Sequence, residues 1–446
     1  MNRVMKDSGI EWIGEIPKEW DLRRIKTLFS IVAGATPKSG EPTFWNGDIP
    51  WITPADFTTE DVYVASGHKE ITQEGLDSCA TTLIPAESII FSKRAPVGLV
   101  AINRKSLCTN QGCLSCIPKE NIATKYYYYA MSVFAEQFNM LATGTTFKEI
   151  AAEVFCGFIL PYPHIGIQKR ISSYLDKKCA EIDSLIASKE KTNSLLKEWR
   201  QSIIYEAVTK GLDSNVPMKD SGIEWIGKIP ENWDVVRIKY ILDESEYGIK
   251  IGPFGSALSN RTLLFGAYCV YSQANLITND FSEANHYIDR ETFEMLQNYE
   301  VAPGDICVSM MGTIGKCKEV PIGIKQGIMD SHLIKIRLNN NKVNSGYFEY
   351  VYDKDYSGVC FTQMKYDKKG TIMDGLNTSI VKNLFIPLPP LSVQKKIASN
   401  LDKKCEKIDS AIKKNTEIVE KLKEYRQSLI YEAVTGKICI NEMEKK

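Results

Sequence analysis

The sequence predicts a mixed α/β fold built as an internal repeat. Two similar α/β domains are separated by two long helices that pair as an antiparallel coiled coil, and the halves are related by a pseudo-twofold axis. Two observations predict this arrangement. The ten residues "MKDSGIEWIG" at 5–14 recur letter for letter at 218–227, and residues 168–209 match 394–435 at more than half of their positions. Both long segments carry apolar residues at heptad spacing, which is typical of paired helices.

Length and composition bound the class of protein. The 446 residues are enough for roughly three domains. Lys plus Arg and Asp plus Glu balance at 55 each, whereas a free-standing, non-specific nucleic-acid binder is usually basic. Either DNA is not the ligand, or positive charge is local, or a partner supplies part of it. No apolar run approaches the roughly 18–20 residues of a membrane span, and the N-terminus lacks the apolar core of a signal peptide.

The twelve cysteines are scattered singly, apart from Cys113 and Cys116. One C-x-x-C without a second pair or nearby histidines is a weak zinc signal. Cys116 lies in the alternating stretch "CLSCIP", which favours buried strand residues. Free thiols in a reducing cytosol fit the whole set.

The repeats divide the chain into a constant frame around two variable blocks. The blocks barely align but share a rhythm, since 83–102 and 301–320 each read as a Pro, an apolar strand and a Gly-bearing loop. We therefore expect two domains with one fold and different surfaces. The expected divisions are a first short repeat at 1–26, a variable block at 27–167, a helix at 168–211, a second short repeat at 212–239, a variable block at 240–393, a helix at 394–437 and a tail at 438–446.

The long repeat predicts a helix in each copy, roughly 60 Å long. The predicted seam steps by four and three through Ile171, Leu175, Lys178, Ile182, Leu185, Lys189, Thr192, Leu196, Trp199 and Ile203. In the second copy it steps through Ile397, Leu401, Lys404, Ile408, Ala411, Asn415, Ile418, Leu422, Tyr425 and Leu429. Ser392 is the expected N-cap and Gly436 the expected stop. Polar Lys189 and Asn415 would fix the register. Two independent surface helices are the alternative, but both seams run the full length.

With these motifs in view, the sequence resembles the specificity subunit of type I restriction–modification systems over essentially the whole chain. The resemblance rests on "SGIEWIGEIPKEW" and "SGIEWIGKIPENW" opening each half, on "SKRAPVG" and "NQG" in the first block, on "LPPLSVQKKI" leading into the second helix, and on "RQSIIYEAVT" and "RQSLIYEAVT" closing the helices. The duplicated order of these motifs makes the resemblance specific.

The resemblance implies that each variable block is a target-recognition domain that reads one half of a bipartite, asymmetric double-stranded DNA sequence. The helices would set the spacer. Two methyltransferase (M) subunits would dock on the repeats and methylate adenine N6 with S-adenosylmethionine. Restriction (R) subunits would add ATP- and Mg²⁺-dependent cleavage of unmodified DNA. The chain itself would carry no catalysis, cofactor or metal, and would act in the cytoplasm of a bacterium or archaeon, away from membranes.

In the first block, Ser92, Lys93 and Arg94 follow a predicted strand, and the family's matching loop faces DNA. Arg can pair with guanine while Lys and Ser hold phosphate; the alternative is a solvated basic turn. Asn110 and Gln111 suit either adenine or a structural turn. Thr145, Thr146 and Lys148 are further candidates near a glycine. They suit either phosphate binding or a helix N-cap.

In the second block, "SMMGTIGK" takes the place of "SKRAPVG" and offers Ser309, Thr313 and Lys316. Loss of the Lys-Arg pair indicates different base preferences. Lys250 and Ser256 lie on a Gly-rich loop that is not a P-loop, because the G-K-[ST] ending is absent.

Side chains that recur in both frames are candidates for binding partners, or for anchoring the short repeats to the helices. They are Trp12, Trp20, Tyr205, Glu206, Trp225, Trp233, Tyr431 and Glu432. The sequence has no N/D-P-P-Y/F tetrapeptide of amino-methyltransferases, no Walker A motif and no recognisable nuclease constellation. These absences weigh against an enzyme that acts alone. A scaffold that holds two DNA enzymes without reading sequence is the other alternative.

Overall fold

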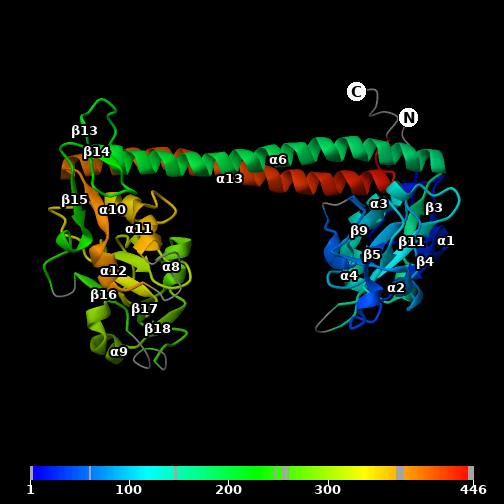
Figure 1. The fold of residues 1–446 in the computed structure, drawn as a ribbon, viewed down its shortest axis with the longest axis horizontal. Coiled ribbons are helices and arrows are strands. Elements are labelled where there is room, and N and C mark those ends of the chain that lie inside the picture. Colours follow the sequence, from blue (N-terminus) through cyan, green and yellow to red (C-terminus); the bar gives the residue numbers. More distant parts are fainter. Residues whose placement is uncertain are drawn as a thin grey trace. The chain divides into compact units, whose positions relative to one another are not determined.

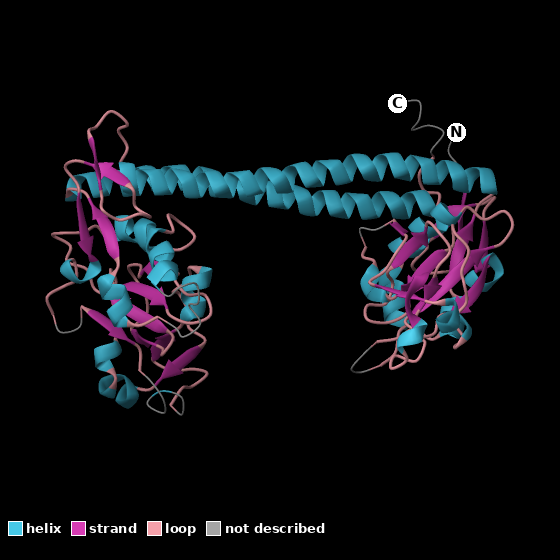
Figure 2. Cartoon of the chain, in the orientation of Figure 1, coloured by secondary structure: helices cyan, strands magenta, loops and turns pink. Residues whose placement is uncertain are grey.

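The computed structural model describes residues 4–59, 62–144, 148–245, 248–253, 258, 261–367 and 376–439. The chain forms two compact units (Figures 1 and 2). Unit 1 comprises Met1–Lys189 and Glu417–Lys446, and unit 2 comprises Glu190–Thr416. Each unit therefore contains one variable block and parts of both long helices.

Unit 1 is built on a five-stranded sheet of order β4-β11-β8-β9-β6 and a three-stranded sheet of order β10-β5-β7. The strands of the two sheets are β4 (Phe29–Ala33), β5 (Trp45–Ile52), β6 (Tyr63–Val64), β7 (Lys69–Ile71), β8 (Ile89–Ser92), β9 (Val100–Asn103), β10 (Cys108–Thr109) and β11 (Cys113–Pro118). The helices of the block are α1 (Ile25–Leu28), α2 (Gln73–Asp77), α3 (Thr124–Val133), α4 (Ala135–Leu141) and α5 (Ala152–Gly157), with short 3-10 turns at Pro42–Phe44 and Pro54–Asp56.

Both faces of the five-stranded sheet are buried, and β8 shows why its sequence is continuously apolar. Ile89 and Phe91 face the main core, which α3, α4 and the long helices complete. Ile90, between them in the sequence, faces a second core together with Ile52. Successive side chains on a strand point to opposite faces, so a strand covered on both sides needs apolar residues throughout. Cys113 and Cys116 are both buried in β11, as predicted.

Unit 2 repeats this topology. Its sheets have the orders β16-β22-β19-β20 and β18-β17-β21, which match β4-β11-β8-β9 and β7-β5-β10. The central strand of the smaller sheet has one parallel and one antiparallel neighbour in both units. The strands are β16 (Ile249–Ile251), β17 (Tyr268–Tyr271), β18 (His286–Ile288), β19 (Ile306–Ser309), β20 (Cys317–Glu319), β21 (Gly327–Met329) and β22 (Leu333–Ile336). The helices are α8 (Gln273–Thr278), α9 (Arg290–Met295), α10 (Ser345–Tyr352), α11 (Val359–Asp367) and α12 (Thr378–Asn383), with 3-10 turns at Ile238–Tyr240 and Gln297–Tyr299. Two domains with one fold are confirmed.

The two predicted long helices are α6 (Ile165–Lys210, 46 residues) and α13 (Leu391–Val434, 44 residues). At 1.5 Å per residue each is about 65–70 Å long. In unit 2, Asn193 contacts Asn415 while Arg200 contacts Asp409. The numbers rise along one helix as they fall along the other, so the pairing is antiparallel, as predicted. In unit 1 the first part of α6 lies beside the last part of α13 (Figure 1).

The predicted seam is correct at one of its two alternating positions, whereas at the other it is correct at the first residues, Ile171 and Ile397, which are buried, and wrong further along the helices. Ile182 and Ile408 are buried as predicted. Beyond Ile171 and Ile397, the buried residue at that second position comes one place later than predicted in both helices. Cys179, Ile186, Asn193 and Arg200 are more buried than Lys178, Leu185, Thr192 and Trp199, and Cys405, Val419 and Arg426 are more buried than Lys404, Ile418 and Tyr425. The aromatic rings suit a heptad pattern, yet the arginines beside them bury their stems and extend to a carboxylate on the facing helix.

Local contacts and backbone geometry define both ends of α13. The Pro390 carbonyl accepts the N–H of Val393 at 2.8 Å. The helix therefore begins at Leu391 and encloses Ser392, so the predicted Ser392 N-cap is wrong. Gly436, with φ +74°, ends α13 as predicted. A Cβ at Gly436 would lie 2.5 Å from the Pro17 side chain, so this close approach requires glycine.

Each short repeat packs at the end of a long helix. The first repeat forms the hairpin β1 (Met5–Asp7) and β2 (Glu15–Pro17), followed by β3 (Asp21–Arg24), which pairs with β12 (Ile159–Tyr162). The second forms β13 (Met218–Asp220) and β14 (Lys228–Pro230), followed by β15 (Asp234–Arg237), which pairs with β23 (Phe385–Leu388). In unit 1 the first repeat packs on α13, and in unit 2 the second repeat packs on α6.

Candidate nucleic-acid interface

The loop after β8 in unit 1 is shaped by a buried serine. The Ser92 hydroxyl donates to the Pro96 carbonyl at 2.6 Å and accepts from the Leu99 N–H at 2.8 Å. Ser309 in unit 2 repeats this, donating to the Thr313 carbonyl and accepting from the Lys316 N–H at 3.1 Å. Both serines are fully buried. The structure therefore places them as loop-forming residues rather than as surface groups.

Lys93 and Arg94 project from this loop and share one carboxylate. Lys93 Nζ lies 2.7 Å from Glu149 Oε1, and Arg94 Nη1 lies 3.4 Å from Glu149 Oε2. The hydrogen bond from Lys93, with the positive charges of both basic groups, lowers the pKa of the Glu149 carboxyl below its ordinary value. The side chains of Arg94 and Glu149 are 36% and 37% exposed and that of Lys93 is 19% exposed, so the group lies at the surface.

The backbone holds Glu149 in place independently of its charge. The Ile150 N–H donates to the Lys93 carbonyl at 2.9 Å, and Thr143 and Glu149 exchange N–H···O bonds of 3.0 and 2.9 Å. Lys148, beside Glu149, is exposed. Thr145 and Thr146 lie outside the described residues. Lys148 is thus attached, through its neighbours Glu149 and Ile150, to the loop that carries Lys93 and Arg94.

Asn110 and Gln111 adjoin the same loop, because the Lys93 N–H donates to the Gly112 carbonyl at 2.9 Å. The Asn110 side chain accepts the Gly112 N–H at 2.8 Å, which is a turn-forming role. The Gln111 side chain accepts a hydrogen bond from the Thr36 hydroxyl at an exposed position. The fold therefore gathers Lys93, Arg94, Gln111 and Lys148 around one loop system of unit 1.

The equivalent loop of unit 2 carries different chemistry. Met310 and Met311 stand where unit 1 has Lys93 and Arg94, since the Leu376 N–H donates to the Met310 carbonyl just as Ile150 does to Lys93. Thr313 accepts a hydrogen bond from Gln273 at 2.5 Å, and Lys316 pairs with Asp355 at 2.5 Å. Lys250, predicted to lie on a loop, lies instead in strand β16, and its ammonium group is over the Tyr299 ring, 4.5 Å from the ring centroid. Ser256 lies outside the described residues.

The recurring aromatic residues anchor the short repeats. Trp20 and Trp233 are almost fully buried. The Tyr431 hydroxyl donates to the Ile13 carbonyl at 2.9 Å, and the Tyr205 hydroxyl donates to the Trp225 carbonyl at 3.1 Å. Trp12 stacks on Phe158 with centroids 5.6 Å apart and, like Trp225, is half-buried. Glu206 and Glu432, on the last turns of the two helices, are exposed.

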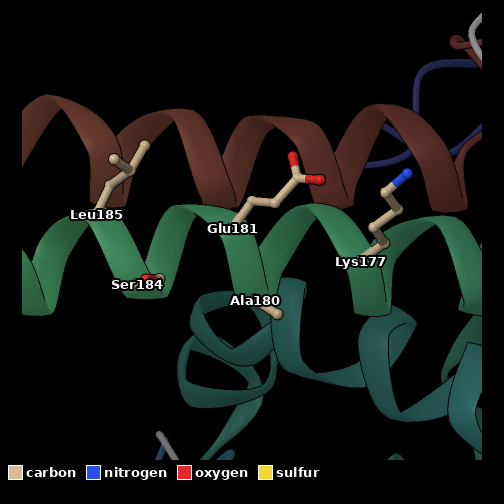
Figure 3. A pocket seen from close by; sticks show the side chains of 5 residues that line it. All are labelled: Lys177, Ala180, Glu181, Ser184 and Leu185. Atoms are coloured by element: carbon tan, nitrogen blue, oxygen red, sulfur yellow. The ribbon is translucent and has the colours of Figure 1, made fainter.

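A hollow in unit 1 lies along α6 and is lined by side chains of that helix alone. Figure 3 shows Lys177, Ala180, Glu181, Ser184 and Leu185 around it. Leu185 is 54% exposed, and the Glu181 carboxylate pairs with Lys178 at 2.8 Å. The arrangement offers a shallow helix surface.

The twelve cysteines are free thiols, and most of them are buried. In the part of the chain that the structure describes, no three His, Cys, Asp or Glu side chains gather to hold a metal ion. Over the same residues, no helix is both long and apolar enough to cross a membrane.

Sequence reasoning missed Glu149. Its carboxylate pairs with the candidates Lys93 and Arg94, and Lys148 precedes it in the chain. One signal was present. The first block has both the Lys-Arg pair and this acid, whereas the second block has two methionines and, before Leu376, a glycine. At these equivalent positions, basic residues and the acid occur together in one block and are both missing from the other, although Asp374 precedes the glycine. This joint change favours a contact between them.

Comparison with known proteins gives one family. The model of the type I restriction modification DNA specificity domain matches residues 17–197 and again 230–420. The type I restriction enzyme MjaIX specificity subunit of Methanocaldococcus jannaschii is 27% identical over 445 residues, covering 97% of this chain and 96% of the relative. The EcoR124I/EcoR124II specificity subunit of Escherichia coli is 33% identical over 184 residues, covering 39% of this chain and 41% of the relative.

Solved structures share the fold. A chain from work on complex assembly and conformational transition of the type I R-M system has a TM-score of 0.72 at 14% identity, covering 95% of this chain and 99% of that chain. The HsdS subunit of Thermoanaerobacter tengcongensis has a TM-score of 0.52 at 14% identity, covering 95% of this chain and 98% of that chain.

Proposed function

Because the chain belongs to the type I restriction–modification DNA specificity family, we propose that it is the specificity subunit of such a complex. Each variable block reads one half of a bipartite, asymmetric DNA target, and the two long helices set the unread spacer. The repeats dock two methyltransferase subunits that methylate adenine N6. With restriction subunits added, the complex cleaves unmodified DNA.

The observation that supports this most is a frame of matched contacts around unmatched loops. The buried Tyr126 hydroxyl donates to the Val434 carbonyl at 2.8 Å in unit 1, and Tyr347 donates to Val208 at 3.2 Å in unit 2. Gln168 and Gln394 each donate to a proline carbonyl at 2.8 Å. The loops that follow β8 and β19 differ, since the first carries Lys93 and Arg94 and the second carries Met310 and Met311. A constant frame with two different surfaces suits a protein that reads two different half-sites.

The same frame supports two identical docking sites. Identical partner subunits need identical surfaces, and a single chain provides them only by internal duplication. The exposed Glu206 and Glu432 lie at equivalent places on the last turns of α6 and α13. We assign these acids, with the short repeats beside them, to methyltransferase docking.

The division into domains follows from this assignment. The variable blocks 27–167 and 240–393 are the recognition domains, and 1–26 and 212–239 are the docking segments. The spacer helices, predicted at 168–211 and 394–437, are α6 (Ile165–Lys210) and α13 (Leu391–Val434). Catalysis, S-adenosylmethionine, ATP and Mg²⁺ belong to the other subunits. The place of action is the cytoplasm, where the DNA is.

The test is base-resolution mapping of N6-methyladenine in cells that express the chain with its methyltransferase subunit. We expect one bipartite motif that disappears when the chain is omitted. Methylation that is independent of the chain, or spread over unrelated sequences, contradicts the proposal.

A block exchange separates sequence reading from scaffolding. Replacing residues 27–167 with the equivalent block of a relative should change one half of the methylated motif and leave the other half intact. An unchanged motif would indicate a scaffold that holds DNA enzymes without reading sequence.

A further inference from the structure

One carboxylate neutralises the basic loop of unit 1. Glu149 contacts both Lys93, at 2.7 Å, and Arg94, at 3.4 Å. Backbone hydrogen bonds from Thr143 and Ile150 fix the segment on either side of it. The carboxylate is therefore attached where these two cations emerge, and its position does not depend on the ion pairs alone.

An acid at this place is unfavourable for binding DNA by charge alone. Phosphate groups repel a carboxylate, and most affinity for arbitrary DNA comes from Lys and Arg groups that neutralise phosphates. Lys93 and Arg94 would each supply such a contact if they were unpaired. Glu149 neutralises much of that attraction. An acid at this place therefore calls for a function that offsets the lost affinity.

Unit 2 provides an internal comparison. At the positions of Lys93 and Arg94 it has Met310 and Met311, and the residue before Leu376 is Gly375, which lies outside the described residues. The position equivalent to Glu149 thus carries no acid where there is no basic pair, although Asp374 precedes it in the sequence. A purely structural role for the acid in the shared fold would predict one in both units.

The shared carboxylate also orders the two side chains. A guanidinium held by a carboxylate loses less rotamer freedom when it binds a base edge, so less of the contact energy is lost to ordering. Phosphate contacts add affinity without sequence information, whereas base contacts carry it. Pairing the cations with an internal acid weakens their contacts with phosphates. It also holds the side chains in place for contacts with bases.

We propose that Glu149 is a specificity-determining positioning residue: it competes with DNA phosphates for Lys93 and Arg94, and it holds them in the geometry used at the target sequence. This inference rests on the proposed DNA-reading function. Glu149 acts through the two basic residues and lowers affinity for non-target DNA.

The experiment uses the full chain assembled with its methyltransferase subunits, and duplexes with and without the motif found by methylation mapping. Binding is measured across a salt series for the wild type and for Glu149→Gln. We expect tighter non-target binding, a slope of log Kobs against log salt more negative by about one to two units, and at least about a threefold loss of target-over-non-target preference.

Two further variants separate this role from a general effect of net charge. Glu181→Gln deletes one negative charge from an exposed ion pair of the same unit, and should leave the preference unchanged. In a Lys93→Gln/Arg94→Gln background, Glu149→Gln should have no further effect. Thermal unfolding of each variant checks that the frame is intact.

The outcomes are distinguishable. If the wild-type complex shows no preference for the mapped motif, the proposed function itself fails. If the wild type prefers its motif and Glu149→Gln has the same salt slope and the same preference, only this inference is overturned. The inference is also overturned if Glu149→Gln raises non-target affinity in the Lys93→Gln/Arg94→Gln background as much as it does in the wild type.

Discussion

Arg200 Nε lies 2.9 Å from Asp409 Oδ1 and joins α6 to α13 in unit 2, and Arg426 lies at the same distance from Asp183 in unit 1. The arginines occupy equivalent positions of the two long repeats, and so do the aspartates. Each arginine pairs with the acid of the other helix. An antiparallel pair of equivalent helices produces this reciprocity, because each contact is then made twice.

The arginine pairs should stabilise the helix pairing in both units. Arg200→Met and Arg426→Met should each lower the free energy of unfolding by about 1 kcal/mol, since the stems are largely buried while the acids are half-exposed. The two losses should add, because the pairs share no residue. Urea unfolding measures both. Arg290→Met, in an exposed pair on α9, is the control, and an equal loss there would deny the helix pairs any special role.

Two buried tyrosines should matter for their hydroxyl groups alone. Tyr126→Phe leaves the Val434 carbonyl at the end of α13 without its donor, and Tyr347→Phe does the same for Val208 at the end of α6. An unsatisfied buried carbonyl costs about 1–3 kcal/mol, so we expect that loss in urea unfolding for each variant. Tyr425→Phe, at an exposed site, should be neutral. Two neutral core variants would mean that solvent satisfies these carbonyls.

A matched deletion tests the spacer. Removing 186–192 from α6 and 417–423 from α13 takes one heptad from each helix and retains both arginine pairs and the Asn193–Asn415 contact. Each helix shortens by about 10 Å, equivalent to about three base pairs. Methylation mapping should show the same two half-sites with a shorter gap. Deleting the heptad from only one of the two helices should disrupt their pairing. Altered half-sites after the matched deletion would refute the spacer role.

The duplicated acids at the helix ends test the docking surface. Glu206→Arg or Glu432→Arg alone should leave a complex with one methyltransferase subunit, and the double variant should bind none. Mass measurement of the purified complexes reads this directly. Because both acids are exposed, stability should change by less than about 0.5 kcal/mol. Two bound subunits in the double variant would place docking elsewhere.

The fold was largely predictable because duplication doubled every signal. Near-identical flanks located the helices and heptad spacing gave their pairing. The spacing did not distinguish Trp199 from Arg200, since an exposed aromatic ring and a buried arginine stem both violate the usual pattern. The Ser392 cap failed because the chain enters α13 through Pro390, whose carbonyl already accepts the first helical N–H groups.

The candidate site was less accessible to sequence reasoning. Ser92 and Ser309 looked like surface groups after a strand, yet each closes its loop from inside. Glu149 is 55 residues from Arg94 in the sequence, and only the topology brings them together. Which side chain faces a neighbour depends on such long-range pairing, and spacing along one segment does not encode it.

The assignment of residues to units has a consequence for biosynthesis. Unit 2 is one continuous stretch, Glu190–Thr416, whereas unit 1 joins the beginning of the chain to the last part of α13. On the ribosome, unit 2 has all its residues first, while the first block waits roughly 10 to 50 s at ordinary elongation rates for the helix that completes its core. Val434 and its neighbours are the last residues that the core of unit 1 receives. A truncation shortly before them should therefore make unit 1 sensitive to proteases and leave unit 2 folded.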